Sequence, residues 1–264
     1  MNFTTLNIEI NNEVVFCSLN RPEKRNALNE QLLKDLHTLC ISLEDRQDVR
    51  GLVLRGSGKV FSSGADLSMM SDISGKTEEE LKIEAGLFYD CFDALNRLSI
   101  PTICYVHGGV HGGANGLVSA CDFALSDPGT IFSFGEVRLG LVPATVAPFV
   151  MRRTGIMNAR KMMLGASAFS SAEARALGLI DIICTEAESG TTIMELIGQI
   201  LENSPSAVRE TKKMLLNIQY NPDPESLREL CTGLIAQTRL SDDAMEGISA
   251  FFEKRDPSWK SKIF

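Results

Sequence analysis

The chain has 264 residues, 44% of them hydrophobic, and a formal net charge of −8 at pH 7. This length and composition predict one large domain, with at most a small appendage, and a sizeable core. The acidic balance argues against nucleic acid or an anionic membrane as a partner, although a local cluster could still bind an anionic small ligand. We expect no membrane span and no secretory signal, because long apolar runs and a basic N-terminal segment are missing.

The cysteines and histidines favour neither disulfides nor a metal site. The seven cysteines are widely spaced, odd in number and contain no Cys-x-x-Cys pair. Buried free thiols in a reducing, cytoplasmic compartment are the simplest interpretation. The three histidines have no ligand spacing. We therefore expect no metal in this protein.

Strand-like and helix-like segments alternate along the first two thirds of the chain, which predicts a mostly parallel sheet with helical crossovers. Predicted strands cover residues 5–9, 14–19, 51–55, 102–106, 123–125, 130–134 and 179–184. Predicted helices cover residues 29–43, 77–98, 170–178, 190–202, 205–217, 224–237 and 241–254, with short ones after 66 and 113. Asn29 is the expected cap of the first helix, and Ser170 with Glu173 fits a capping box.

The stretch from His107 to Pro143 carries most of the candidate chemistry. Its first half is rich in glycine, which we interpret as a turn that presents backbone N–H groups to a ligand. Its second half holds Glu136 among small and aromatic residues. Burial there would raise the pKa of this carboxyl group toward the range useful for proton transfer near neutral pH. A structural ion pair with Arg138 or Arg152 is the alternative interpretation.

Two earlier stretches could meet a negatively charged ligand. Residues 20–28 place two adjacent cations in a loop, where they could contact phosphate groups or simply form a solvated basic turn. Residues 61–67 combine small side chains with Asp66, a predicted helix cap, so that the amide of Ala65 would lie near a helix start. Taken alone, that stretch could also be an ordinary loop.

The amides of Ala65 and Gly113 would form an oxyanion hole if they face one point. Each donor in such a hole stabilises charge on a carbonyl oxygen by roughly 3–4 kcal/mol. Tight packing of a helix on a strand is the alternative for the glycines. His111, beside them, could titrate near neutral pH or be a satisfied side chain near the site.

In this order along the chain, these stretches resemble the enoyl-CoA hydratase/isomerase family, also called the crotonase family. The resemblance covers essentially the whole chain. Each matching segment is a weak signal alone, and together they are a strong one. The segments are residues 20–28, 61–67, 112–122, 134–143, 172–180 and 246–255.

The resemblance implies an α/β fold with a ββα spiral core (1–190) and a helical C-terminal region (191–264) that packs trimers, often dimerised to hexamers. It implies an acyl-CoA thioester as ligand, with no cofactor beyond the coenzyme A of the substrate. Ala65 and Gly113 match the oxyanion hole of the family. Glu136 matches the second of two family glutamates, which exchanges a proton with the substrate carbon skeleton. The residues expected to contact the substrate are Lys24, Arg25, Ala27, Ser63, Asp66, His111, Gly112 and Gly116.

One residue departs from the family pattern. Counting back from Cys121 and Asp122 without a gap, Gly116 stands where the first hydratase glutamate is expected. The pair of carboxylates that holds and activates water therefore lacks one member. Within the family, the residues around Cys121 and the segments 136–144 and 253–259 look most like the bacterial methylglutaconyl-CoA hydratase group.

Hydration of a 2-enoyl-CoA, with Glu136 as the proton donor to C2, is the leading hypothesis. Water would then be held by Glu136 alone, by His111 or Asn115, or by a carboxylate of the substrate. A Δ3,Δ2-enoyl-CoA isomerase and a decarboxylase of a branched glutaconyl-CoA are the enzymatic alternatives. An acyl-CoA-binding relative with little catalysis is another. An RNA-binding relative is disfavoured by the charge of −8.

Overall fold

The computed structural model describes residues 3–71, 75–220 and 223–260. Its main sheet has six strands in the order β1-β2-β3-β4-β6-β9. These strands are β1 (Leu6–Asn11), β2 (Val14–Leu19), β3 (Gly51–Gly56), β4 (Thr102–Val106), β6 (Phe123–Ser126) and β9 (Ile182–Ile183). β1 and β2 form an antiparallel hairpin, and the other neighbours run parallel. The predicted parallel sheet is confirmed.

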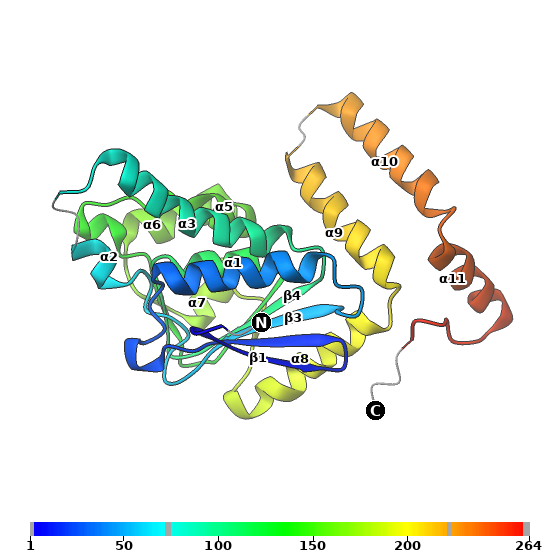
Figure 1. Ribbon diagram of the computed structural model, residues 1–264, viewed down its shortest axis with the longest axis horizontal. Coiled ribbons are helices and arrows are strands. Elements are labelled where there is room, and N and C mark those ends of the chain that lie inside the picture. The colour runs from blue at the N-terminus through cyan, green and yellow to red at the C-terminus, as the bar shows by residue number, and fades with distance from the viewer. Residues whose placement is uncertain (1–2, 72–74, 221–222, 261–264) are drawn as a thin grey trace.

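Helices cover both faces of this sheet (Figure 1). α1 (Glu30–Glu44) and α3 (Glu78–Arg97) lie side by side on one face. α8 (Glu186–Leu201) lies on the other, where its apolar side chains join those of β2, β3 and β4 in a second core cluster. The helix begins earlier than residue 190 because Thr185 and Glu188 form a capping box. The predicted boundary between residues 190 and 191 falls inside α8.

Local side-chain caps set several helix starts as the sequence indicates. The Asn29 side chain accepts a hydrogen bond from the Leu32 amide at 3.0 Å, which confirms the cap of α1. The predicted capping box of Ser170 and Glu173 is present at α7 (Ser171–Ala176). The late strand predicted over 179–184 is shorter, and only Ile182–Ile183 pairs with β6.

A second, three-stranded sheet lies beside the main one. It consists of β5 (Gly109–His111), β7 (Ile131–Ser133) and β8 (Phe169–Ser170). β5 falls in the segment predicted as a glycine turn, so the turn itself is confined to the residues that follow. A strand this short has too few positions to show alternation, which is why the sequence pattern missed it. β5 carries the chain directly into the candidate site.

The remaining helices surround the candidate site or follow the core. They are η1 (Pro22–Lys24), α2 (Leu67–Ser71), α4 (Ala114–Ala120), η2 (Glu136–Leu139), α5 (Ala147–Thr154), α6 (Ile156–Gly165), α9 (Pro205–Tyr220), α10 (Pro224–Thr238) and α11 (Asp242–Glu253). α10 and α11 extend away from the sheet (Figure 1). Across the described ranges, no helix is long and apolar enough to cross a membrane.

All seven cysteines are free thiols. Six are buried as predicted, whereas Cys231 is exposed on α10, because this helix buries none of its described side chains. Burial raises the pKa of the Cys40 thiol to about 12. A thiol held protonated in this way is a poor nucleophile, so Cys40 has a packing role.

Candidate active site

The loop before α1 is fastened to the loop after β3 by one buried amide. The Asn26 side chain is fully buried and accepts a hydrogen bond from the Arg21 amide at 2.9 Å. It donates to the carbonyl oxygens of Ser57 at 2.8 Å and Val60 at 3.0 Å. The Ser62 hydroxyl donates to the Asn26 carbonyl oxygen at 2.8 Å. The two loops expected to bind the ligand are therefore joined into one surface.

Asn26→Ala should destabilise the fold by about 2–3 kcal/mol, since three backbone groups lose their buried partner. Denaturant unfolding measures this change, with the same dependence of the unfolding free energy on denaturant concentration used for both proteins. Asn7→Ala, at an exposed position in β1, is the matched control and should change the free energy of unfolding by less than about 0.5 kcal/mol. Equal stability of the two variants would show that the amide does not hold the loops together.

Asp66 is held by protein groups. Its Oδ2 pairs with Arg21 Nη1 at 2.9 Å, and its Oδ1 accepts hydrogen bonds from the Ser68 amide at 3.1 Å and hydroxyl at 2.9 Å. Burial alone would raise the pKa of this carboxyl group, but the donors from Ser68 and Arg21 hold it below its usual value. The predicted helix cap is therefore present, and both carboxylate oxygens already have protein partners. The ion pair with Arg21 was not predicted.

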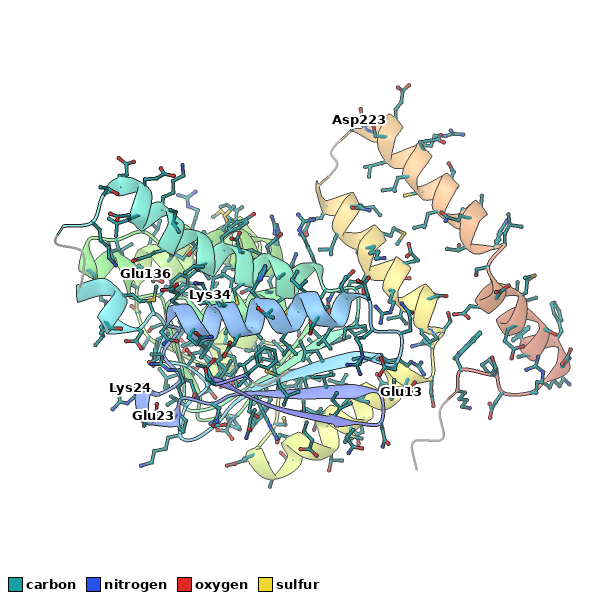
Figure 2. The ribbon with its side chains drawn as sticks, in the orientation of Figure 1. Glu13, Glu23, Lys24, Lys34, Glu136 and Asp223 are labelled. Atoms are coloured by element: carbon teal, nitrogen blue, oxygen red, sulfur yellow. The ribbon has the colours of Figure 1, made fainter. Side chains whose placement is uncertain are left out.

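The predicted phosphate-contacting cations lie on the rim of the site. Lys24 and Arg25 are exposed, and Ala27 is buried just behind them. Figure 2 shows Lys24 projecting from its loop at the same end of the molecule as Glu136. The Ser63 amide donates to the Arg25 carbonyl oxygen at 3.0 Å, which keeps the two predicted contact segments adjacent.

The two segments that supply the predicted oxyanion hole touch each other. The His111 amide donates to the Ser62 carbonyl oxygen at 3.2 Å. A Cβ atom on Gly64, which has φ +87°, would lie only 2.5 Å from the His111 carbonyl oxygen, so only glycine permits this approach. In the described part of the chain, the amides of Ala65 and Gly113 have no hydrogen-bond acceptor. Both donors are thus available to a ligand.

Glu136, the first residue of η2, is the carboxylate next to this pair. Its Oε1 lies 3.1 Å from the position that a Cβ atom of Gly112 would occupy, so the carboxylate sits against the glycine turn. Its Oε2 is buried and has no hydrogen-bond partner among the residues that the structure describes. Burial raises the pKa of Glu136. No arginine is among the groups that shift this pKa, and no salt bridge from Glu136 to Arg138 or Arg152 is found among the described residues.

Because the pKa of Glu136 is raised, we expect both the stability of the fold and the activity to depend on pH. A folded pKa above the unfolded value stabilises the fold at low pH, and this contribution is lost as pH rises through the folded pKa. Activity should instead increase as pH rises, if the ionised carboxylate is the form that accepts a proton. We therefore expect kcat/KM to rise with pH through a value above the usual glutamate range. A pH–rate profile that is flat there would contradict the role of Glu136 as a base.

His111 contacts the strand that leads to Glu136. Its Nδ1 lies 2.8 Å from the Ser133 hydroxyl oxygen. Burial, and then the nearby charge of Arg25, lowers the pKa of His111. The imidazole is therefore neutral at pH 7, a state in which it can accept or donate a hydrogen bond but carries no charge for an anionic ligand.

Gly116 does not leave room for a second carboxylate. This residue is buried in α4, and a Cβ atom on it would lie 2.5 Å from Cε2 and 2.7 Å from Cζ of Phe92. The Phe92 ring is fully buried and packs edge-on against Phe149 at 5.7 Å. The position of the first family glutamate is thus filled by an aromatic ring from α3. Sequence periodicity predicted α3 but could not show which side chain fills this space.

Comparisons with known proteins point to one family. The enoyl-CoA hydratase/isomerase family model matches residues 9–262. A protein of Thermus thermophilus that carries the name of an enoyl-CoA hydratase is 33% identical over 244 residues, 92% of this chain and 95% of that protein. The peroxisomal Δ(3,5)-Δ(2,4)-dienoyl-CoA isomerase of Arabidopsis thaliana is 32% identical over 253 residues, 90% of each chain.

Solved structures give the same result. The crystal structure of an enoyl-CoA hydratase from Shewanella pealeana has a TM-score of 0.92 and 30% identity, over 97% of this chain and 96% of that one. An enoyl-CoA hydratase/isomerase from Marinobacter aquaeolei has a TM-score of 0.92 and 27% identity, over 97% and 99% of the two chains. With its crotonase-type α/β fold, this chain belongs to the enoyl-CoA hydratase/isomerase family.

Proposed function

We propose that this protein is an acyl-CoA hydratase that adds water across the C2=C3 double bond of a 2-enoyl-CoA, or removes it in the reverse direction. The observation that carries the proposal is the Glu136 carboxylate. It is half-buried, has one oxygen without a partner in the described part of the chain, and lies against the turn that leads to the Gly113 amide. A desolvated carboxylate beside two free amide donors suits proton transfer next to a polarised carbonyl group.

In the proposed reaction, the thioester oxygen accepts hydrogen bonds from the Ala65 and Gly113 amides. This withdraws electrons from the conjugated double bond and makes C3 electrophilic. Water attacks C3, Glu136 accepts a proton from that water, and the negative charge moves to the thioester oxygen as an enolate. Glu136 then returns a proton to C2, so the carboxylate ends in its starting state and water has been added.

The loop cations support a coenzyme A ester as the substrate. Lys24 and Arg25 are exposed at the rim of the site, and Ser63 and Ala27 lie beside them. Guanidinium and ammonium groups at such a rim favour phosphate oxygens. Coenzyme A carries these phosphates together with the thioester that the amide pair would bind.

A Δ3,Δ2-enoyl-CoA isomerase is the second candidate, because Phe92 fills the space next to Gly116 and leaves one carboxylate. A single carboxylate can carry a proton between C4 and C2 without any water. A panel of acyl-CoA thioesters incubated in oxygen-18 water and analysed by mass spectrometry separates the two reactions. We expect labelled 3-hydroxyacyl-CoA. An unlabelled isomer would favour the isomerase, carbon dioxide release a decarboxylase, and tight binding without turnover a non-catalytic relative.

A substrate with a second carboxylate, such as a methylglutaconyl-CoA, is the acyl group that we propose. The guanidinium carbon of Arg152 lies 5.4 Å from the centroid of the Phe149 ring, and this ring packs on Phe92. A cation therefore stands at the far end of the aromatic cluster that covers Gly116. The same thioester panel tests this proposal, since a straight-chain ester of equal length should have a lower kcat/KM.

We also propose that the protein is a homotrimer or homohexamer in the cytoplasm. Large apolar side chains are exposed on η2 and its following loop and on α11. They include Leu139 (66% exposed), Val142 (75%), Phe251 (78%) and Phe252 (77%). Contacts between copies would remove these side chains from water. Light scattering of the purified protein measures the mass, and a monomer would contradict this part of the proposal.

A further inference from the structure

Asn115, the second residue of α4, makes two side-chain hydrogen bonds inside the site. The side chain is fully buried. Its amide nitrogen Nδ2 lies 3.0 Å from the Gly112 carbonyl oxygen and 3.0 Å from the Ser133 carbonyl oxygen. Its Oδ1 is buried and has no hydrogen-bond partner within residues 3–71, 75–220 and 223–260. The Asn115 side-chain nitrogen therefore donates to two backbone carbonyl groups, whereas its oxygen accepts no hydrogen bond from the described residues.

The hydrogen bond from Asn115 Nδ2 to the Gly112 carbonyl oxygen affects the Gly113 amide, one of the two predicted oxyanion donors. The Gly112 carbonyl group and the Gly113 N–H belong to the same peptide unit, which is planar. A hydrogen bond accepted by the carbonyl oxygen fixes the plane of the unit and so the direction of the N–H. It also polarises the unit, because hydrogen bonds in series strengthen one another. Asn115 thus orients and strengthens a donor that it does not touch.

The second bond reaches the carboxylate segment. The Ser133 carbonyl oxygen also accepts a hydrogen bond from the Gly112 amide at 2.9 Å. Ser133 ends β7, and only two residues separate it from Glu136. The Asn115 side chain therefore bridges the segment that supplies the oxyanion amide and the segment that supplies the acid–base group.

We infer that Asn115 is a positioning residue that holds the Gly112–Gly113 peptide in register with Glu136. This inference rests on the proposed function, in which both groups act on one thioester. The turn itself does not depend on the side chain, because the Asn115 backbone amide also donates to the Gly112 carbonyl oxygen at 3.0 Å. Loss of the side-chain donor should therefore leave the turn in place, while it weakens the polarisation of the Gly112–Gly113 peptide and removes the side-chain link to the Ser133 carbonyl oxygen.

Asn115→Asp tests the inference, since it keeps the shape of the side chain and replaces its donor by an acceptor. Asn115→Ala is the second variant, in case the new charge prevents folding. Ser119→Ala is the matched control: Ser119 is also buried in α4, and its hydroxyl has no hydrogen-bond partner among the described residues. Melting temperatures identify which variants are folded.

The readout is the carbonyl stretch of butanoyl-CoA labelled with carbon-13 at the thioester, recorded by isotope-edited infrared spectroscopy. We expect binding to wild-type protein to lower this frequency, Ser119→Ala to lower it equally, and both Asn115 variants to lower it less. We also expect kcat to fall about 10- to 100-fold in the Asn115 variants, with KM changed less than about threefold. A wild-type frequency shift and a wild-type kcat in folded Asn115 variants would overturn the inference.

The same experiment separates this inference from the proposed function. Glu136→Gln should keep the carbonyl shift, since the oxyanion amides do not need the carboxylate. If Glu136→Gln keeps both the shift and the turnover, the proposed role of Glu136 fails and the role of Asn115 in orienting the amide stands. If wild-type protein shows no shift, the oxyanion assignment fails, and the inference on Asn115 fails with it.

Discussion

Glu136→Gln is expected to lower kcat about 10²- to 10⁴-fold, the range that a positioned general acid–base group contributes. The variant keeps the size and most of the polarity of the side chain, but it can neither accept a proton from water nor return one to C2. The two amide donors and the loop cations remain, so the dissociation constant of an acyl-CoA should change little. Steady-state kinetics with the best thioester of the panel, together with calorimetric titration of a saturated acyl-CoA, measures both quantities.

Glu195→Gln is the control for this variant. Glu195 is exposed on α8, the helix on the other face of the main sheet. Glu195→Gln removes one carboxylate from the chain, as Glu136→Gln does, and should leave kcat unchanged. Turnover in Glu136→Gln equal to that of this control would refute the assignment of Glu136.

Gly116→Glu is expected to destabilise the protein by more than about 3 kcal/mol, although it restores the residue type of the family pattern. The first atom of the new side chain would overlap the Phe92 ring, which is fully buried and cannot move aside without disturbing Phe149. The carboxylate would also be placed in the core without a partner. Denaturant unfolding measures the loss, and a stable Gly116→Glu protein would contradict the steric account.

The double variant Phe92→Ala with Gly116→Glu should be more stable than the sum of the two single effects predicts. Phe92→Ala alone should cost about 3–5 kcal/mol, because it leaves a cavity. In the double variant the glutamate side chain enters that cavity, so a double-mutant cycle should give a favourable coupling energy of about 1–3 kcal/mol. Strict additivity would show that Phe92 and the side chain at residue 116 do not compete for the same space.

The sequence predicted the elements whose signals are local. The apolar runs of β2 and β4 end at the predicted residues. Asn29 and the Ser170–Glu173 pair cap helices as their types indicate. The paired glycines at residues 112 and 113 predict a backbone that a ligand can approach closely, with Glu136 as the acid of that stretch, and both stay predictions. These features depend on residues a few positions apart, which a sequence pattern can show.

Contacts between distant segments could not be predicted in the same way. Phe92 fills the space next to Gly116, although 23 residues separate them. The helical pattern of residues 77–98 predicts α3, but it does not show that Phe92 supplies the ring at that position. The ion pair of Arg21 and Asp66 likewise joins two loops whose approach depends on the folded sheet. The glycine at residue 116 revealed that a carboxylate was missing, and only the structure reveals what replaces it.

The most direct test of the central claim, that Glu136 alone transfers the proton at C2, is hydration of a 2-enoyl-CoA in deuterium oxide. Mass spectrometry of the 3-hydroxyacyl-CoA product locates the label. The account predicts one deuterium at C2 with wild-type protein and with Glu195→Gln, and almost no product with Glu136→Gln. Deuterium at C2 formed by Glu136→Gln at the wild-type rate would contradict the claim.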